Sequence, residues 1–426
     1  MESEVKNKKI NKHALIAGFS GNILEWYDFT VYGFLATVIG AQFFPQENKT
    51  VQLIAAFGIF AAGYLMRPIG GAIFGHIGDK QGRKKALLIS VLMMAIPTTL
   101  IGFLPSYKDI GWVAPLLLVL LRLFQGLSVG GEFTGSMSFL VENAPKNKRG
   151  FLGSWSAFGV FGGMLLGAAI TSLITKYLTH DQLHDFGWRI PFFLGAFIGV
   201  FSLMLRKGMN AEAEINNEST ESKKTPLSEF WENYKIPSLK IILLTWPMGA
   251  SVYLIFIFLP SFLHTFLNVQ LSLTLSAHTI SLILLMLLIP LFGLLNDRIG
   301  RKPVLFISLL GFVLLSYPLF KLLFIGSFQA ILGAMIVFAI IEAIMQSVIP
   351  TMITEVFPKK IRYTGLSVSY NVSAAVLGGT TPLICTWLVK VSNGNHMMPV
   401  YYLIFTAVVG IIIGLTMKET YKKDLE

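Results

Sequence analysis

Long apolar runs separated by short polar loops dominate the chain. A helix needs about 20 apolar residues to cross roughly 30 Å of hydrocarbon. The sequence predicts twelve such spans, near residues 16–40, 51–76, 86–105, 113–140, 151–177, 189–207, 240–266, 273–295, 303–324, 328–353, 364–389 and 399–417. The longest polar stretch, residues 208–237, follows the sixth span and holds too few apolar residues to pack into a core. We therefore expect an all-α membrane protein with two six-helix halves, residues 1–207 and 238–426, around a central cavity and joined by a linker at 208–237.

Composition supports this expectation, and the charge distribution gives it an orientation. Of the 426 residues, 54% are hydrophobic and only 13% are charged, which is typical of a membrane protein. A net charge of +11 would suit a nucleic-acid partner, but most Lys and Arg fall in the termini and loops on one side of the predicted membrane. By the positive-inside rule, both termini and the linker are cytoplasmic. We expect a multi-pass protein of the cell (inner or plasma) membrane. We expect the lipid bilayer as its surroundings and no nucleic-acid partner.

Neither end of the chain, nor its one cysteine, predicts a further element. The basic segment before the first span resembles a signal peptide, but that span contains Asn22, Glu25 and Asp28, so we expect it to be retained. Cys385 is the only cysteine and lies in an apolar segment, which excludes an intramolecular disulfide and a cysteine-based metal cluster. We expect no metal and no cofactor.

Two motifs recur at matching loops of the two halves. Gly-x-x-x-Asp-x-x-Gly-Arg-Lys follows the second and eighth spans, and Glu-x-x-Pro-Lys-x-x-Arg follows the fourth and tenth. An Asp at a helix end can cap the N-terminus of another helix, and the nearby Arg83 or Arg301 can bind Glu142 or Glu355. Such contacts exist only while the cytoplasmic side is shut. The pattern therefore predicts a cytoplasmic gate that stabilises an outward-facing state. Its residues are Gly75, Asp79, Arg83, Glu142, Arg149, Gly293, Asp297, Arg301, Glu355 and Arg362.

The gate loops, together with Arg122-x-x-Gln125-Gly126 in the fourth span, resemble the signatures of the major facilitator superfamily. Within it the chain is most similar to the metabolite:H⁺ symporters, which include proline/betaine, shikimate, citrate and 2-oxoglutarate carriers. The residues that carry this likeness are 21–29, 67–75, 130–133, 187–192, 370–371 and 378–382. The resemblance implies a twelve-helix fold and alternating access, in which two repeat halves rock around a central cavity. Some proline/betaine carriers extend into a C-terminal coiled coil that does not follow Met417 here, so osmotic activation through such a tail is left open.

Ionisable residues inside the spans are the candidates for the chemistry. Charge in hydrocarbon is costly and usually marks a water-filled cavity or a partner, and the sequence offers Glu25, Asp28, Arg67, Arg122, Glu132 and Glu342. At about 1.5 Å per residue, Glu25 and Arg67 fall at similar depths, and Asp28 and Arg122 both fall near mid-depth. Glu25 could therefore pair with Arg67, and a second pair between Asp28 and Arg122 is geometrically possible. Static pairs that hold the helices in register are one interpretation, and exchange of the arginine between a carboxylate and a substrate is the other.

We favour the second interpretation, since the planar guanidinium can bind both oxygens of a carboxylate. In this hypothesis Glu25 or Asp28 takes the symported proton while Arg67 or Arg122 alternates between that carboxylate and an anionic group of the solute. Two further glutamates could take part in proton coupling. Glu132 lies toward the cytoplasmic end, where a gating role is as plausible, and Glu342 forms one polar face with Gln346 that points either to the cavity or to a neighbouring helix.

Three polar residues complete the predicted solute-binding set with the two arginines. Gln125 lies one turn from Arg122 and shares its helical face. Tyr370 and Asn371 either line the cavity or hydrogen-bond across helices, as polar residues in membranes commonly do. We expect the remaining aromatic residues to be largely lipid-facing or core.

The expected function is therefore proton-coupled symport of a small organic solute by alternating access, with the protein acting as a monomer. The family resemblance makes a proline- or betaine-type zwitterion the first choice and a mono- or dicarboxylate such as shikimate or 2-oxoglutarate the alternative. A non-transporting sensor of the same fold is a remote alternative. We do not expect an enzyme, because the sequence offers no nucleophile–base arrangement, no His-rich metal set and no nucleotide-binding loop.

Overall fold

The computed structural model describes residues 12–44, 48–81, 83–207 and 232–425, and within them the chain is helical without strands. The first half contains α1 (Lys12–Phe34), α2 (Ala36–Phe43), α3 (Lys49–Leu65), α4 (Arg67–Gln81), α5 (Arg83–Phe103), α6 (Tyr107–Ile110), α7 (Val113–Ser128), α8 (Glu132–Glu142), α9 (Arg149–Tyr177), α10 (His180–Asp185) and α11 (Ile190–Lys207). The second half contains α13 (Lys235–Tyr253), η4 (Leu254–Phe258), α14 (Leu259–Leu267), α15 (Leu271–Ile299), α16 (Arg301–Leu323), α17 (Phe328–Thr354), α18 (Arg362–Val372), η5 (Ser373–Gly378), α19 (Thr381–Val391) and α20 (Met398–Thr416).

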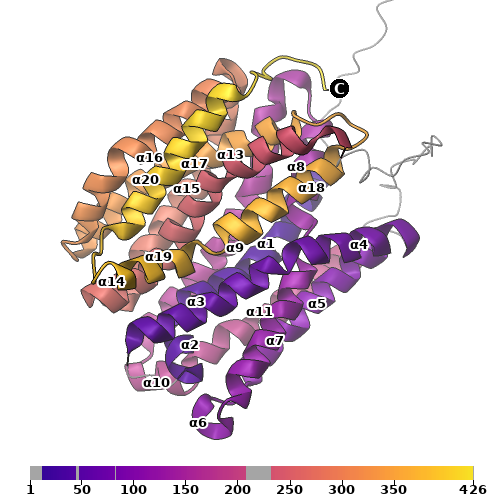
Figure 1. The fold of residues 1–426 in the computed structure, drawn as a ribbon. Coiled ribbons are helices and arrows are strands. Elements are labelled where there is room, and N and C mark those ends of the chain that lie inside the picture. The colour runs from indigo at the N-terminus through magenta and orange to yellow at the C-terminus, as the bar shows by residue number, and fades with distance from the viewer. Residues whose placement is uncertain (1–11, 45–47, 82, 208–231, 426) are drawn as a thin grey trace, which may run out of the picture.

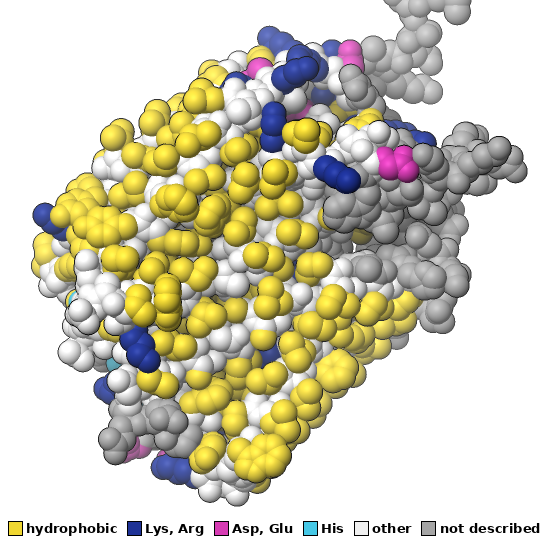
Figure 2. Space-filling view, in the orientation of Figure 1, with side chains coloured by type: hydrophobic (Ala, Val, Ile, Leu, Met, Phe, Trp, Pro, Cys, Tyr) yellow, Lys and Arg dark blue, Asp and Glu magenta, His cyan; other side chains and the backbone are white. Residues whose placement is uncertain are grey.

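These helices account for the twelve predicted spans. Nine helical segments in the described residues are long and apolar enough to cross a membrane, and Ile89–Phe103 and Gly187–Phe201 are shorter apolar helices. The remaining predicted span corresponds to α1. The helices lie side by side in Figure 1, and the face drawn in Figure 2 is largely hydrophobic, with most of its Lys and Arg side chains toward the two ends of the molecule. Side chains such as Leu314, Phe197 and Ile412 are exposed on this surface, as contact with lipid requires.

Several predicted spans are interrupted, which the apolar pattern did not indicate. The first breaks at Leu35 between α1 and α2, the second at Met66 between α3 and α4, and the fourth before α8. In the second half, η4 and η5 are stretches of π-helix inside otherwise α-helical spans. Helix α13 begins at Lys235, within the segment predicted as linker, whose residues 208–231 lie outside the described part.

Close approach of helices in the first half depends on glycine. A methyl group on Gly126 of α7 would collide with the carbonyl of Gly63 on α3, and one on Gly70 of α4 would collide with the backbone of Leu127. Small residues at helix contacts allow backbones to touch, which is how helices associate in lipid. This contact fixes α4 against α7 and so sets the positions of Arg67 and Arg122.

We use "linker face" for the end of the molecule where α11 ends, α13 begins and the C-terminus lies (Figure 1), and "opposite face" for the other end.

Candidate functional site

Arg67 and Glu25 form a buried ion pair between α4 and α1. Arg67 Nη2 lies 2.7 Å from Glu25 Oε1, and the two side chains are 2% and 3% exposed. The pairing predicted from helical depth is therefore confirmed. A charge pair without access to water depends on its partner for stabilisation, since removing one member leaves the other buried and uncompensated.

A second buried pair, also predicted from depth, joins Arg122 of α7 to Asp28 of α1. Arg122 Nη1 lies 3.1 Å from Asp28 Oδ2 and 2.8 Å from Gln125 Oε1. Thr98 of α5 donates to Asp28 Oδ1 at 2.6 Å and accepts from Gln125 Nε2 at 2.8 Å. Nothing in the sequence indicated that Thr98 belongs to this cluster, because a threonine in a membrane span usually bonds to its own helix. Gln125, predicted to bind solute, is thus occupied within the Asp28 cluster.

The two arginines have different surroundings. The guanidinium of Arg122 lies 4.7 Å from the ring centre of Phe29 and 4.3 Å from that of Tyr32, so aromatic rings enclose it. Arg67 uses Nη2 for Glu25 and lies 5.0 Å from the ring centre of Tyr64. Its Nε and Nη1 are buried and have no hydrogen-bond partner among the described residues, and the same is true of Arg122 Nε and Nη2. What distinguishes Arg67 is that it interacts electrostatically with Tyr253 and Tyr370 of the second half. A buried donor without an acceptor is costly, so Arg67 retains capacity to bind a further anion.

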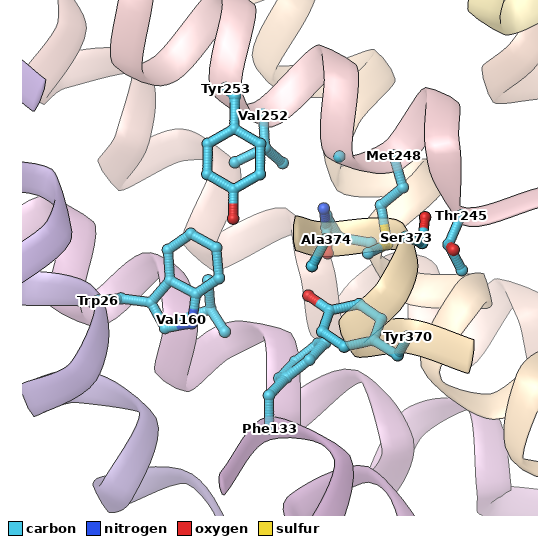
Figure 3. Close-up of a pocket in the computed structure, with 12 residues that line it drawn as sticks. Trp26, Phe133, Val160, Thr245, Met248, Val252, Tyr253, Tyr370, Ser373 and Ala374 are labelled. Atoms are coloured by element: carbon cyan, nitrogen blue, oxygen red, sulfur yellow. The ribbon is translucent and has the colours of Figure 1, made fainter. Parts of the chain in front are cut away.

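A small pocket lies between the two halves, next to Arg67. Its volume is about 20 Å³, and it is lined by Trp26, Phe133 and Val160 from the first half and by Thr245, Met248, Gly249, Val252, Tyr253, Gln346, Tyr370, Ser373 and Ala374 from the second (Figure 3). Arg67 interacts electrostatically with Tyr253 and Tyr370 of this wall. A cavity of this size holds about one water molecule. The pocket therefore has to widen before it can take an organic solute.

The remaining predicted site residues divide between the pocket and its surroundings. Tyr370 lines the pocket, whereas Asn371 donates to the carbonyl of Gly130 at 2.5 Å and so joins α18 to the first half. Glu342 is fully buried on α17 and accepts from Gln346 Nε2 at 2.7 Å. No Lys or Arg among the described residues forms an ion pair with Glu342. Glu132 is the first residue of α8 and is partly exposed.

At the linker face the second-half gate motif binds across to the first half. Asp297 accepts hydrogen bonds from the backbone N–H groups of Gly150 and Phe151, both at 2.7 Å, at the N-terminus of α9. A carboxylate there satisfies donors that the helix leaves unpaired and interacts favourably with the helix dipole. The predicted capping role of Asp297 is thereby confirmed, and a methyl on Gly293 would collide with the α9 backbone.

The other gate residues form a set of ion pairs around this cap. Arg301 binds Asp297 at 3.2 Å and Glu355 at 3.0 Å, while Glu142 pairs with Arg362 at 3.0 Å across the halves. Arg149 lies 3.6 Å from Glu355. The side chains of Gly75, Asp79 and Arg83 lie outside the described part of the structure.

The C-terminal segment 417–425 adds contacts that the sequence did not predict. Glu419 accepts from the backbone N–H groups of Arg301 and Lys302 at 3.1 and 2.9 Å and so caps α16. Burial raises the pKa of Glu419, but backbone N–H groups, these two included, outweigh it and hold the pKa below its usual value. Arg149 Nη1 donates to the carbonyl of Lys423 at 2.7 Å. The segment therefore touches both halves at the linker face.

The two halves also meet on the other side of the pocket. Rings pack across the halves in the pairs Phe57–Phe258, Phe161–Phe256 and Phe34–His278, with centroids 5.6, 6.0 and 5.0 Å apart. Beyond them, a cavity of about 270 Å³ opens toward the opposite face. The two halves are thus in contact both at the linker face and on the other side of the pocket, which is an occluded arrangement. That the gate stabilises an outward-facing state stays a prediction.

Comparison with known families and relatives decides the family. A model described as "Sugar (and other) transporter" matches residues 13–210, and one described as "Major Facilitator Superfamily" matches residues 241–424. The proline/betaine transporter of Escherichia coli K12 is 36% identical, with 99% of this chain and 86% of that protein covered. The chain belongs to the major facilitator superfamily of transporters.

Other comparisons agree with this family. The glycine betaine/proline/ectoine/pipecolic acid transporter OusA of Dickeya dadantii is 37% identical over 97% of this chain and 85% of that protein. Among solved structures, a D-xylose-proton symporter matches with a TM-score of 0.75 at 19% identity, covering 97% of this chain and 99% of the other. An inward-open structure of the xylose transporter XylE from E. coli gives 0.70 at 19% identity, covering 96% and 97%. At this identity the structural likeness establishes the fold alone.

Family membership makes the protein a multi-pass membrane transporter, and transporters of this kind are not enzymes. Among the residues that the structure describes, no three His, Cys, Asp or Glu side chains lie close enough together to hold a metal ion. The central pocket and the two buried ion pairs are therefore the features from which a transport mechanism has to be built.

Proposed function

We propose that this transporter moves a small zwitterion, with one carboxylate and one ammonium group, together with a proton by alternating access. The observation that carries the proposal is Arg67: it is buried against the wall of the central pocket, and two of its nitrogens have no acceptor. Arg67 can bind a carboxylate through this edge. The names of the relatives, proline/betaine transporter and glycine betaine/proline/ectoine/pipecolic acid transporter, agree with such a solute.

Coupling between proton and solute follows from competition between the Glu25 carboxylate and the solute carboxylate for Arg67. While Glu25 is ionised, it neutralises Arg67 and weakens the attraction for a second carboxylate. A proton on Glu25 leaves the arginine charge for the solute, so proton and solute favour each other's binding, as linkage requires. Asp28 and Arg122 form a static pair in this scheme, because the rings of Phe29 and Tyr32 enclose the guanidinium.

Glu342 is the second proton site that we propose. It has no ion-pair partner among the described residues and lies one hydrogen bond behind the pocket wall, through Gln346. A carboxylate with no cation nearby is strongly disfavoured in a low-dielectric interior, so Glu342 is protonated in the occluded state. Its deprotonation would accompany opening to water.

A dicarboxylate is less well served by the same geometry. A second carboxylate would require Arg122, whose Nε and Nη2 also lack partners but whose guanidinium is enclosed by the rings of Phe29 and Tyr32. The alternative of a mono- or dicarboxylate:H⁺ symporter therefore rests on Arg67 alone.

The proposal includes an orientation and an organisation of the chain. Both termini and the linker face lie in the cytoplasm, and the protein spans the inner membrane of the cell. Residues 208–237 link the two six-helix halves, and the monomer is the transporting unit.

Uptake of labelled glycine betaine into proteoliposomes tests the proposal. We expect accumulation only under an inward proton gradient, and loss of uptake in both Arg67→Gln and Arg67→Lys, since Lys lacks the planar fork. Arg189→Gln is the matched control, because Arg189 stacks on Trp188 and does not line the pocket. Equilibration that does not depend on the gradient would reject proton coupling, and unchanged affinity in both Arg67 variants would reject the carboxylate assignment.

A further inference from the structure

The central pocket offers no carboxylate to the positive end of a zwitterion. None of the twelve lining residues is Asp, Glu, Lys or Arg. Four of them are aromatic: Trp26 and Phe133 from the first half, and Tyr253 and Tyr370 from the second. All four are at most 5% exposed, so their rings face the pocket or protein and not lipid.

The rings form two pairs, each with one member from either half. Trp26 and Tyr253 have centroids 6.0 Å apart with planes at 21°, and Phe133 and Tyr370 are 5.0 Å apart with planes at 51°. The hydroxyls of Tyr253 and Tyr370 point into the space between the rings (Figure 3). Ring faces and hydroxyl oxygens both present negative potential, so the pocket interior favours positive charge without containing an anion.

We propose that Trp26, Phe133, Tyr253 and Tyr370 form an aromatic cage that determines specificity and selects an N-alkylated ammonium group. This inference rests on the proposed function, because it concerns the same pocket. A quaternary ammonium spreads its charge over methyl groups, is weakly hydrated and donates no hydrogen bonds, so ring faces are suitable partners for it. A primary ammonium is more strongly hydrated and carries three N–H donors, which the faces of the four rings do not satisfy.

The cage also connects recognition with occlusion. Because each pair takes one ring from either half, the pairs come together only when the halves approach around the pocket. A solute that contacts both pairs therefore favours an arrangement in which the halves approach each other around a widened pocket over either open arrangement, because a ligand shifts a conformational equilibrium toward the state that it binds best. Alkyl groups on the nitrogen fill the space between the rings, and a bare ammonium does not.

Binding to the purified transporter in detergent tests the cage separately from transport. The competitors against labelled glycine betaine are glycine, N,N-dimethylglycine and 3,3-dimethylbutanoate, whose tert-butyl head has the shape of trimethylammonium but no charge. We expect affinity to rise with each methylation, and the neutral isostere to bind about tenfold more weakly than glycine betaine. If the isostere binds as tightly as glycine betaine, the pocket recognises shape and not charge. If glycine binds as tightly as glycine betaine, the pocket does not recognise alkylation of the nitrogen. Either result overturns the proposal.

Variants connect the selectivity to the rings. The quantity measured is the ratio of affinities for glycine betaine and 3,3-dimethylbutanoate within one variant, which does not depend on the amount of folded protein. Trp26→Leu should lower this ratio severalfold and Trp26→Phe should preserve most of it. Trp246→Leu is the matched control, since Trp246 lies on α13 with Tyr253 but bonds to Tyr402 away from the pocket. An unchanged ratio in Trp26→Leu would overturn the assignment of this ring.

The two proposals fail in different ways. If proteoliposomes equilibrate glycine betaine without a proton gradient while the binding ratios hold, the cage stands and proton coupling is rejected. If uptake is driven by the proton gradient but the ratio of affinities for glycine betaine and 3,3-dimethylbutanoate is the same in the parent and in Trp26→Leu, the proposed function stands and the cage is rejected. If glycine betaine does not bind to the purified protein at all, both are rejected.

Discussion

Replacing Asp297 with Asn should shift the transporter toward a state open at the linker face. Asp297 is 6% exposed and accepts two backbone hydrogen bonds of 2.7 Å from α9 across the halves. A hydrogen bond to a charged group contributes about 1.5–3 kcal/mol, and Asn keeps one acceptor oxygen but turns an N–H toward the second donor. The expected loss is about 2 kcal/mol, which changes the ratio of closed to open molecules about 30-fold.

A cysteine at Ser154 reports on this opening. Ser154 lies on α9 at the contact with Gly293 of α15 and is fully buried. Because the chain has one cysteine, Cys385, a Cys385→Ala background leaves the reporter as the only thiol. In nanodiscs, alkylation of Ser154→Cys by an impermeant maleimide should be about 30-fold faster in the Asp297→Asn variant.

The control for this experiment is Asp109→Asn. Asp109 also accepts from a helix start, through the backbone N–H and hydroxyl of Ser106, both at 2.8 Å, but it lies within the first half. Its substitution removes a similar cap without touching the contact between halves and should leave the alkylation rate unchanged. An Asp297→Asn rate within twofold of the parent would refute the argument that this cap holds the linker face closed.

Three further outcomes follow from the described contacts. Glu342→Gln should abolish gradient-driven accumulation while retaining exchange of labelled for unlabelled solute, and full accumulation would remove Glu342 from the coupling scheme. Glu419→Gln should lower the unfolding temperature most at pH values above the unfolded carboxyl pKa of about 4.3. Because the pKa of Glu419 is lowered in the folded protein, the stabilisation by its carboxylate should disappear as the pH falls through that lower value. A difference in unfolding temperature between variant and parent that persists in acid would contradict this. Gly126→Ala should prevent recovery of monodisperse protein on size exclusion, because the added methyl meets the carbonyl of Gly63, and a normal elution profile would count against that packing.

The buried ion pairs were predictable because charge inside a membrane span is rare. Counting residues from the span ends placed Glu25 with Arg67 and Asp28 with Arg122, and both pairs are present. The cap by Asp297 was predictable for a related reason, since a carboxylate that recurs at a helix end needs hydrogen-bond donors, and the N-terminus of a neighbouring helix supplies them. In each of these predictions a costly group required a partner.

The walls of the pocket could not be predicted in the same way. Aromatic residues make up 13% of the chain, so Trp26, Phe133 and Tyr253 do not differ from lipid-facing rings in the sequence. Thr98 was missed because a hydroxyl in a span can bond to its own helix, and Thr98 does so with Met94 in addition to binding Asp28. The partner of Glu142 was also not determined by spacing, because several gate arginines were available and Arg362 is the one that binds.

The π-helical turns η4 and η5 adjoin the second-half wall of the pocket, which bears on how the pocket widens. Tyr253 directly precedes η4, and Ser373 and Ala374 belong to η5, so both turns adjoin residues of the second-half wall. In the first half, Trp26 and Val160 lie within the uninterrupted helices α1 and α9. A wide turn can pass along its helix by one residue and rotate the side chains beside it, whereas a regular α-helix resists such a slip. We therefore expect the pocket to widen at the second-half wall and beside the break that precedes Phe133, while Trp26 and Val160 move less.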